Sequence, residues 1–147
     1  MKSKVFILFM VGTVCLSLLG NKTTSAKEDL QIYLNGSKTD SSIMIVKNTV
    51  FVPIEYINSN PKLTFGYIEG ENPKLIILES NDFTVYLTIG SKDAKKNDEN
   101  IKVTTPPFTK NDHKWIPLRF VAETFGLKVN WDPNTKNVSI QTPSKSK

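Results

Sequence analysis

Alternation of apolar and polar positions dominates the chain beyond about residue 30 and predicts β-strands. Residues 83, 85, 87 and 89 are apolar and alternate with polar or amphipathic ones, which is typical of a half-buried strand. Similar patterns predict strands at 32–34, 43–46, 50–52, 63–67, 75–78, 127–131 and 138–140. The continuous apolar run at 75–78 predicts a strand covered on both faces. Asn35-Gly36 predicts a tight hairpin, because that turn needs positive φ at both positions.

One segment has the period of an α-helix instead. Apolar residues at i, i+3, i+4 and i+7 form a single stripe there: Leu118, Val121, Ala122 and Phe125. Pro117 is tolerated in a first helical turn, and Gly126 is typical of the residue that ends a helix. A helix of about two turns is too short to be stable alone, so we expect it to pack on a sheet.

Two segments of the chain repeat at a constant offset. Residues 51–57 (FVPIEYI) match 115–121 (WIPLRFV), and the same offset relates 63–67 to 127–131; we call residues related in this way repeat equivalents. Each unit predicts strands and a short helix in the order β-β-β-α-β-β. One unit is too small to enclose a core, so we expect the two to share one. The prediction is a single α+β domain, rich in β-strands, with short helices packed on antiparallel sheet.

The two units are not expected to have equal helices. Pro61 stands in the first unit where Phe125 stands in the second, and proline disfavours helical geometry in the residue before it. Asn58 also interrupts the apolar stripe of the first unit where the second has Ala122. We expect a helix of about one turn in the first unit and about two turns in the second.

Residues 1–26 have the composition of a cleavable signal peptide. Two lysines precede the uncharged stretch 5–19, and small residues near Ala26 suit signal peptidase, so cleavage is expected between Ala26 and Lys27. A helix over that stretch rises about 22 Å, less than the roughly 30 Å of a hydrocarbon core, so a retained membrane anchor is the weaker alternative. The domain is then expected at 27–142 and a disordered tail at 143–147.

Removal of the leader changes the charge and the cysteine content. The formal charge of +5 falls to +2, because the leader holds three lysines and no acidic residue. Nucleic acid is therefore not an expected partner. The single cysteine, Cys15, also lies in the leader, and Val14 before it is larger than a lipoprotein site admits. The mature domain is expected to be stable without disulfides.

A dense motif lies in the second unit: residues 114–126 (KWIPLRFVAETFG), then VNWD at 129–132 and VSI at 138–140. This motif resembles the copper amine oxidase N-terminal-like domain, also called the stalk domain, over about residues 31–141. In the first unit Glu55 stands where the family has arginine, and the Trp-Asp pair is missing. The resemblance implies an α+β accessory module of exported bacterial proteins. It does not imply oxidase activity, which belongs to a different domain.

No constellation of residues in the chain carries recognisable catalytic chemistry. A copper site needs several imidazoles, and the chain has one histidine, His113, expected in a solvated turn. Structural zinc is not expected without cysteine, so no metal and no cofactor is expected. The segment that begins at Asp132 lacks the central glycine and final glutamate of a calcium loop and is better explained as a hairpin turn. An unrecognised hydrolase is an alternative, with these candidate carboxylates: Glu55, Glu69, Glu71, Glu123 and Asp132.

Four residues of the second unit are candidates for a binding or structural role. Trp115 and Trp131 could form a platform for sugar rings, although their strand positions favour burial in the core. Arg119 stands four residues before Glu123 in the predicted helix, an arrangement that allows a surface ion pair. Alternatively, Arg119 pairs with Asp132 and ties the helix to the following hairpin. A structural role is favoured for Arg119.

These patterns favour a non-catalytic binding or stalk module that acts outside the cytoplasm. The expected partners are a cell-wall polymer, another polysaccharide or another exported protein. Neither nucleic acid nor a membrane span in the mature chain is expected. One alternative is a structural protein of the cell surface that self-associates through an exposed strand edge. A hydrolase is the least favoured interpretation.

Overall fold

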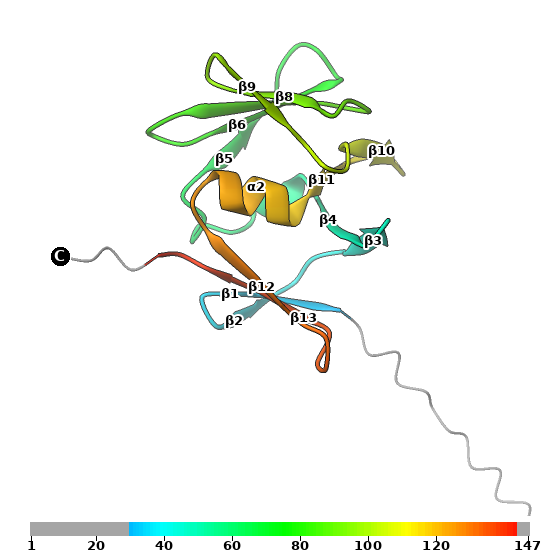
Figure 1. The fold of residues 1–147 in the computed structure, drawn as a ribbon, viewed down its shortest axis with the longest axis vertical. Helices are drawn as coiled ribbons and strands as arrows, with labels where there is room; N and C mark the ends of the chain where they lie inside the picture. The colour runs from blue at the N-terminus through cyan, green and yellow to red at the C-terminus, as the bar shows by residue number, and fades with distance from the viewer. Residues whose placement is uncertain (1–29, 144–147) are drawn as a thin grey trace, which may run out of the picture.

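The computed structural model describes residues 30–143, in which thirteen strands and two short helices follow one another (Figure 1). The strands are β1 Gln31–Leu34, β2 Ser37–Thr39, β3 Met44–Val46, β4 Thr49–Pro53, β5 Gly66–Ile68, β6 Leu75–Glu79, β7 Thr84–Thr88, β8 Asp93–Lys96, β9 Glu99–Lys102, β10 Phe108–Lys110, β11 His113–Pro117, β12 Lys128–Asp132 and β13 Asn137–Gln141. The helices are α1 Glu55–Asn58 and α2 Leu118–Thr124. The predicted leader, its cleavage site at Ala26 and Lys27, and residues 144–147 lie outside the described residues.

The strands form three sheets, and the β-rich α+β prediction is confirmed. Their orders are β12-β13-β1-β2, β10-β11-β4-β3 and β5-β6-β7-β8-β9. Every pair of neighbours is antiparallel except β1 and β13, which run parallel. Figure 1 shows the five-stranded sheet at the top and the β1-containing sheet at the bottom, with α2 and β11 between them.

Strands β4 and β11 lie side by side at the centre of the fold, and they are repeat equivalents. Val52 faces Ile116 directly, and Phe51 faces Pro117. The hairpin β12-β13 joins β1-β2 in one outer sheet, whereas β5-β6 joins β7-β8 in the other. Strands from the two halves of the chain are therefore neighbours in all three sheets.

A single cluster of apolar side chains fills the space between the sheets. Residues from both halves belong to it, among them Ile32, Leu34, Ile76, Leu87, Ile116 and Ile140, which are almost fully buried. No polar or charged residue of the described range is buried. Because unpaired polar groups are costly inside a core, the polar atoms of the buried Tyr56 and Trp115 are hydrogen-bonded, to the Thr39 hydroxyl and the Lys110 carbonyl.

The helices have the predicted lengths. Helix α1 has four residues and α2 has seven, so they are about one and two turns long. Pro117 occupies the N-cap of α2, one position before the first turn. Gly126 has φ +79°, and the Gly126 and Leu127 amides donate to the carbonyls of Glu123 and Ala122. This is the C-terminal motif expected of a glycine at that place. Neither of the described helices is long and apolar enough to cross a membrane.

The hairpin predicted at Asn35-Gly36 is confirmed, with φ values of 49° and 78°. The turn also holds the end of β13. The Asn35 amide donates to the Ile140 carbonyl over 2.8 Å, and its side-chain oxygen accepts the Thr142 amide over 2.9 Å. Asn35, which suits the turn because it tolerates positive φ, thereby also stabilises the parallel pairing of β1 with β13.

Three strand predictions need correction. The order β-β-β-α-β-β is wrong for both units, because four of the described strands precede α1 and five lie between β6 and α2. The strand predicted at 63–67 begins only at Gly66, because the Leu63 amide closes a turn onto the Asn60 carbonyl. Phe65 is buried in that segment, with its ring stacked 4.0 Å from the ring of Phe125. The run at 75–78 is buried on one face only, since its odd-numbered side chains lie on the outer face of the sheet and are half-buried.

Candidate functional site

Trp115 is a core residue, as its strand position predicted. Its side chain is 6% exposed, and its Nε1 donates to the Lys110 carbonyl over 3.2 Å. Its ring is nearly parallel to that of Phe108, with centroids 6.3 Å apart. An indole held in this way has no free face, so Trp115 cannot be part of an aromatic platform.

Trp131 is 41% exposed, which corrects the expectation that it packs in the core. It lies two residues after the buried Val129 and directly opposite the buried Val138, so it is on the core side of β12. It stands one residue before the strand ends, however, where the core stops. The alternation predicted the correct side of the strand, but it carried no information about where the core ends.

Arg119 ties α2 to β12, although not through the predicted carboxylate. Its Nη1 donates to the Val129 carbonyl over 3.0 Å and to Glu123 Oε1 over 3.2 Å. The predicted Arg119–Asp132 pair is therefore wrong, and the predicted i,i+4 pair with Glu123 is present. The bond to a main-chain oxygen was invisible in the sequence, because every residue offers that acceptor.

Asp132 organises its own turn. Its Oδ1 accepts the Asn134 amide over 2.9 Å, and its Oδ2 accepts the Thr135 hydroxyl over 2.8 Å. These hydrogen bonds, that of Thr135 first, lower the pKa of Asp132 below its ordinary value. The side chain is committed to the β12–β13 hairpin, in agreement with the turn-based explanation of this segment.

Two cavities meet at Trp131 and Ile45, and we call them together the Trp131 groove. The first, of about 300 Å³, lies where the start of α2 meets the β3–β4 and β12–β13 hairpins; it is lined by Ile45, Asn48, Thr49, Val50, Leu118, Arg119, Val129, Trp131 and Val138. The second, of about 730 Å³, is lined by Leu30, Gln31, Lys38, Thr39, Asp40, Ser41, Ile43, Ile45, Trp131, Pro133 and Lys136. Ile45 is 56% exposed, so a large apolar side chain accompanies the indole at the junction.

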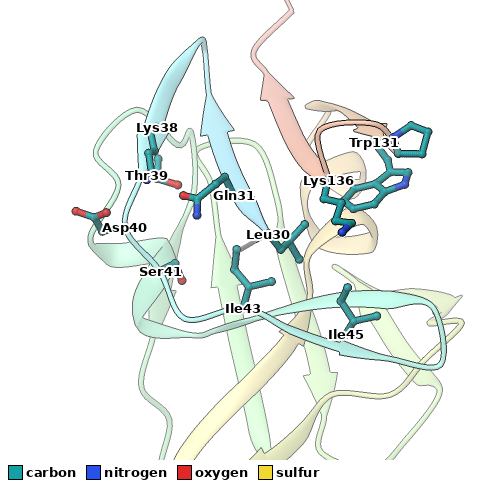
Figure 2. A pocket seen from close by; sticks show the side chains of 11 residues that line it. Leu30, Gln31, Lys38, Thr39, Asp40, Ser41, Ile43, Ile45, Trp131 and Lys136 are labelled. Atoms are coloured by element: carbon teal, nitrogen blue, oxygen red, sulfur yellow. The ribbon is translucent and has the colours of Figure 1, made fainter. Parts of the chain in front are cut away.

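The second cavity brings together segments that are far apart in the chain. In Figure 2, Trp131 and Lys136 extend from the β12–β13 hairpin on one side, and Lys38 and Asp40 lie on the other. Leu30 is drawn between these two sides. The groove thus has apolar side chains in its middle and charged groups at both ends.

Residues 33–140 match the model of the family described as the copper amine oxidase N-terminal domain. The chain belongs to this family. Comparison with the curated proteins gives no match, and comparison with the solved structures gives none. The family is one of non-catalytic modules, and its matched range contains Trp115, Arg119, Trp131 and Asp132.

In this copper amine oxidase N-terminal domain, three of the five carboxylates considered for hydrolysis contact neighbouring side chains, and the other two are exposed in a loop. Glu55 Oε1 lies 3.1 Å from His113 Nδ1, Glu123 binds Arg119, and Asp132 caps its turn. Glu69 and Glu71 are exposed in the loop between β5 and β6. Within residues 30–143, no three His, Cys, Asp or Glu side chains gather in a way that could hold a metal ion.

His113 lies at the start of β11 and not in the solvated turn that the sequence suggested. The turn itself is formed by Asn111 and Asp112, which both have positive φ. The imidazole is more than half exposed and contacts Glu55 of α1. It therefore links the two halves of the domain on the surface.

Proposed function

We propose that this domain is an exported, non-catalytic module that binds a polysaccharide through the Trp131 groove. The observation that carries the proposal is the exposure of the Trp131 indole in a groove, next to the still more exposed Ile45. A flat apolar ring complements the apolar face of a pyranose ring, and polar groups beside it can bind the hydroxyls. Exposed apolar patches often mark the place where a partner binds.

The cell wall is the polysaccharide surface that we propose. The leader pattern supports export, and membership of a non-catalytic family supports binding without turnover. In the groove, Asn48 and Thr49 provide hydrogen-bonding groups beside the indole, and Arg119 provides a cation. The proposed role requires these groups to hold sugar hydroxyls, and it needs no nucleophile and no general base.

Retention on purified cell-wall polysaccharide tests the proposal. We expect the mature chain to sediment with the insoluble polymer and Trp131→Ala to lose most of this retention. The matched control is Tyr67→Ala, because Tyr67 is the repeat equivalent of Trp131 in the first unit. If the unsubstituted chain stays in solution, or if Trp131→Ala is retained equally, the proposal is wrong.

Self-association is a second candidate function, favoured by a separate observation. The large hydrophobic residues that are exposed in the described range are Ile45, Ile68 and Trp131, and each lies on an edge strand of a different sheet. Exposed apolar edges can pair with the edge of another copy. Sedimentation equilibrium decides this point: association that Ile68→Lys abolishes would support it, and a monomer at high protein concentration would exclude it.

A further inference from the structure

Residues of the Trp131 groove have repeat equivalents in the other half of the domain, and the two sets differ in a way that indicates a ligand. The repeat equivalents of Trp131 and Arg119 are Tyr67 and Glu55. Thr49 and Val50, which line the groove, have His113 and Lys114 as their repeat equivalents. Corresponding positions therefore carry different chemistry at the two ends of the β4–β11 pair.

Among these repeat equivalents, the long polar side chains pair with one another. Lys114 Nζ donates to the Tyr67 hydroxyl over 3.1 Å and lies 5.6 Å from the centre of its ring. His113 Nδ1 lies 3.1 Å from Glu55 Oε1. A cation thus already occupies the aromatic face, and the acidic side chain already has its partner.

In the Trp131 groove, the corresponding side chains make different contacts: Thr49 Oγ1 lies 2.9 Å from Thr105 Oγ1, and Arg119 donates to Glu123 and to the Val129 carbonyl. Thr49 and Val50 are too short to extend over the indole as Lys114 extends over Tyr67, so Trp131 stays 41% exposed. Both hydrogen bonds of Arg119 are made by Nη1. Its Nη2 and Nε therefore have no hydrogen-bond partner among residues 30–143, although the side chain lines the same cavity as the indole.

We infer that the groove binds an acidic sugar, with the ring on Trp131 and the carboxylate on the Nη2 and Nε side of Arg119. The inference rests on the proposed function and names its ligand class. A guanidinium presents parallel N–H groups that match the two oxygens of a carboxylate, and such charge-assisted pairs are stronger than neutral hydrogen bonds. With a neutral sugar bound, Nη2 and Nε of Arg119 would have water as their hydrogen-bond partner.

The side chains that line the groove are more often cationic than acidic, which agrees with an acidic ligand. Of the described residues that line it, Lys38, Arg119 and Lys136 are cationic, whereas Asp40 is the single carboxylate. Two further acids lie close to the groove. Glu123 contacts Arg119 only at Nη1, and Asp132 is held by its own turn. Neither of them hydrogen-bonds to the remaining donors of Arg119.

Calorimetric titration with polygalacturonate and with its methyl ester tests the inference, since the two polymers share a backbone and differ in charge. At low salt we expect the acid to bind about tenfold more tightly than the ester, as a charge-assisted pair would provide. Arg119→Gln should bring this ratio close to one while binding to the ester persists, which also shows that the variant is folded. Arg119→Lys should retain part of the preference, and Glu55→Gln all of it.

The outcomes separate the inference from the proposed function. Equal affinity for the acid and the ester overturns the acidic ligand, and an unchanged preference in Arg119→Gln overturns the contact between the carboxylate and Arg119. Both results leave polysaccharide binding in place. Binding to neither polymer, with retention on cell-wall polysaccharide intact, also overturns the inference alone. Failure to bind these polymers together with failure to be retained on the wall overturns both. Added salt should weaken binding of the acid and leave binding of the ester unchanged.

Discussion

Val52 lies directly opposite Ile116 in the β4–β11 pair, and these two residues are also repeat equivalents. Both are fully buried. In this antiparallel pair, each of the two residues faces its own repeat equivalent. An approximate twofold axis therefore passes between Val52 and Ile116, and it relates the two halves. The two halves then meet along a shared strand pair, so we expect the domain to unfold as one cooperative unit.

Ile116→Ala should reduce the free energy of unfolding by about 2–5 kcal/mol, because it removes a fully buried side chain and leaves a cavity. The transition in urea should stay single, since each half contributes strands to every sheet. Ile45→Ala is the control, as that side chain is mostly exposed, and it should shift stability by less than about 0.5 kcal/mol. A two-step transition in Ile116→Ala would show that the halves are independent.

Gly126→Ala should destabilise the domain by about 1 kcal/mol, through backbone conformation and not through a clash. Gly126 has φ +79°, and a Cβ atom there would meet no heavy atom within 4 Å. Gly66→Ala is the matched control, because its φ is not positive and its Cβ would lie at an ordinary 3.8 Å from the Asn58 side-chain oxygen. Thermal unfolding of the two variants should differ, and equal stability would refute the explanation.

Asp132→Ala should make the free energy of unfolding depend less on pH in acid. The hydrogen bonds from Thr135 and Asn134 lower the pKa of Asp132, so the carboxylate contributes stability above the ordinary value of 3.8. That contribution is lost as the pH falls through the lower pKa of the folded state. Urea unfolding above and below pH 3.8 should show a smaller pH difference in Asp132→Ala than in the unsubstituted chain. Thr135→Val should show part of the same change, and an unaltered pH dependence in both would contradict the assignment.

Tyr56→Phe should remove part of the loss of stability in alkali. Burial raises the pKa of Tyr56 above 10.0, while its hydrogen bond with Thr39 acts in the opposite direction. Since the unfolded chain ionises first, stability is complete below pH 10.0 and declines as the pH rises toward the folded-state pKa. Comparing urea unfolding on both sides of pH 10.0 tests this, and an identical alkaline decline in Tyr56→Phe would contradict it.

The sequence predicted the elements whose signals are local. Asn35-Gly36 forms its turn, Gly126 ends α2, and both helices have their expected lengths. The hairpin of β8 and β9 was not predicted, because these strands are mostly charged and bury little more than Ala94. Its turn did leave a weak signal at Asn97-Asp98, where Asn97 adopts φ 51°.

The candidate site was only partly predictable, because it depends on pairing between distant segments. The sequence singled out Trp131 and Arg119 as candidate residues, but alternation alone placed the indole in the core. The indole is exposed because β12 extends beyond the edge of the core at Trp131. Ile45, which lines the same cavity, belongs to a different sheet. The Val129 carbonyl as a partner of Arg119 has no side-chain signature at all.

Quenching of tryptophan fluorescence in Trp115→Phe is the sharpest test of sugar binding on Trp131. Trp131 is then the sole tryptophan of the chain, and the substitution should be tolerated because the repeat equivalent of Trp115 is already a phenylalanine, Phe51. Saturating polygalacturonate should protect Trp131 from quenching by acrylamide, a neutral quencher that the charge of the polymer does not repel. Quenching that stays unchanged while calorimetry shows the polymer bound would place the ligand elsewhere and contradict binding at Trp131.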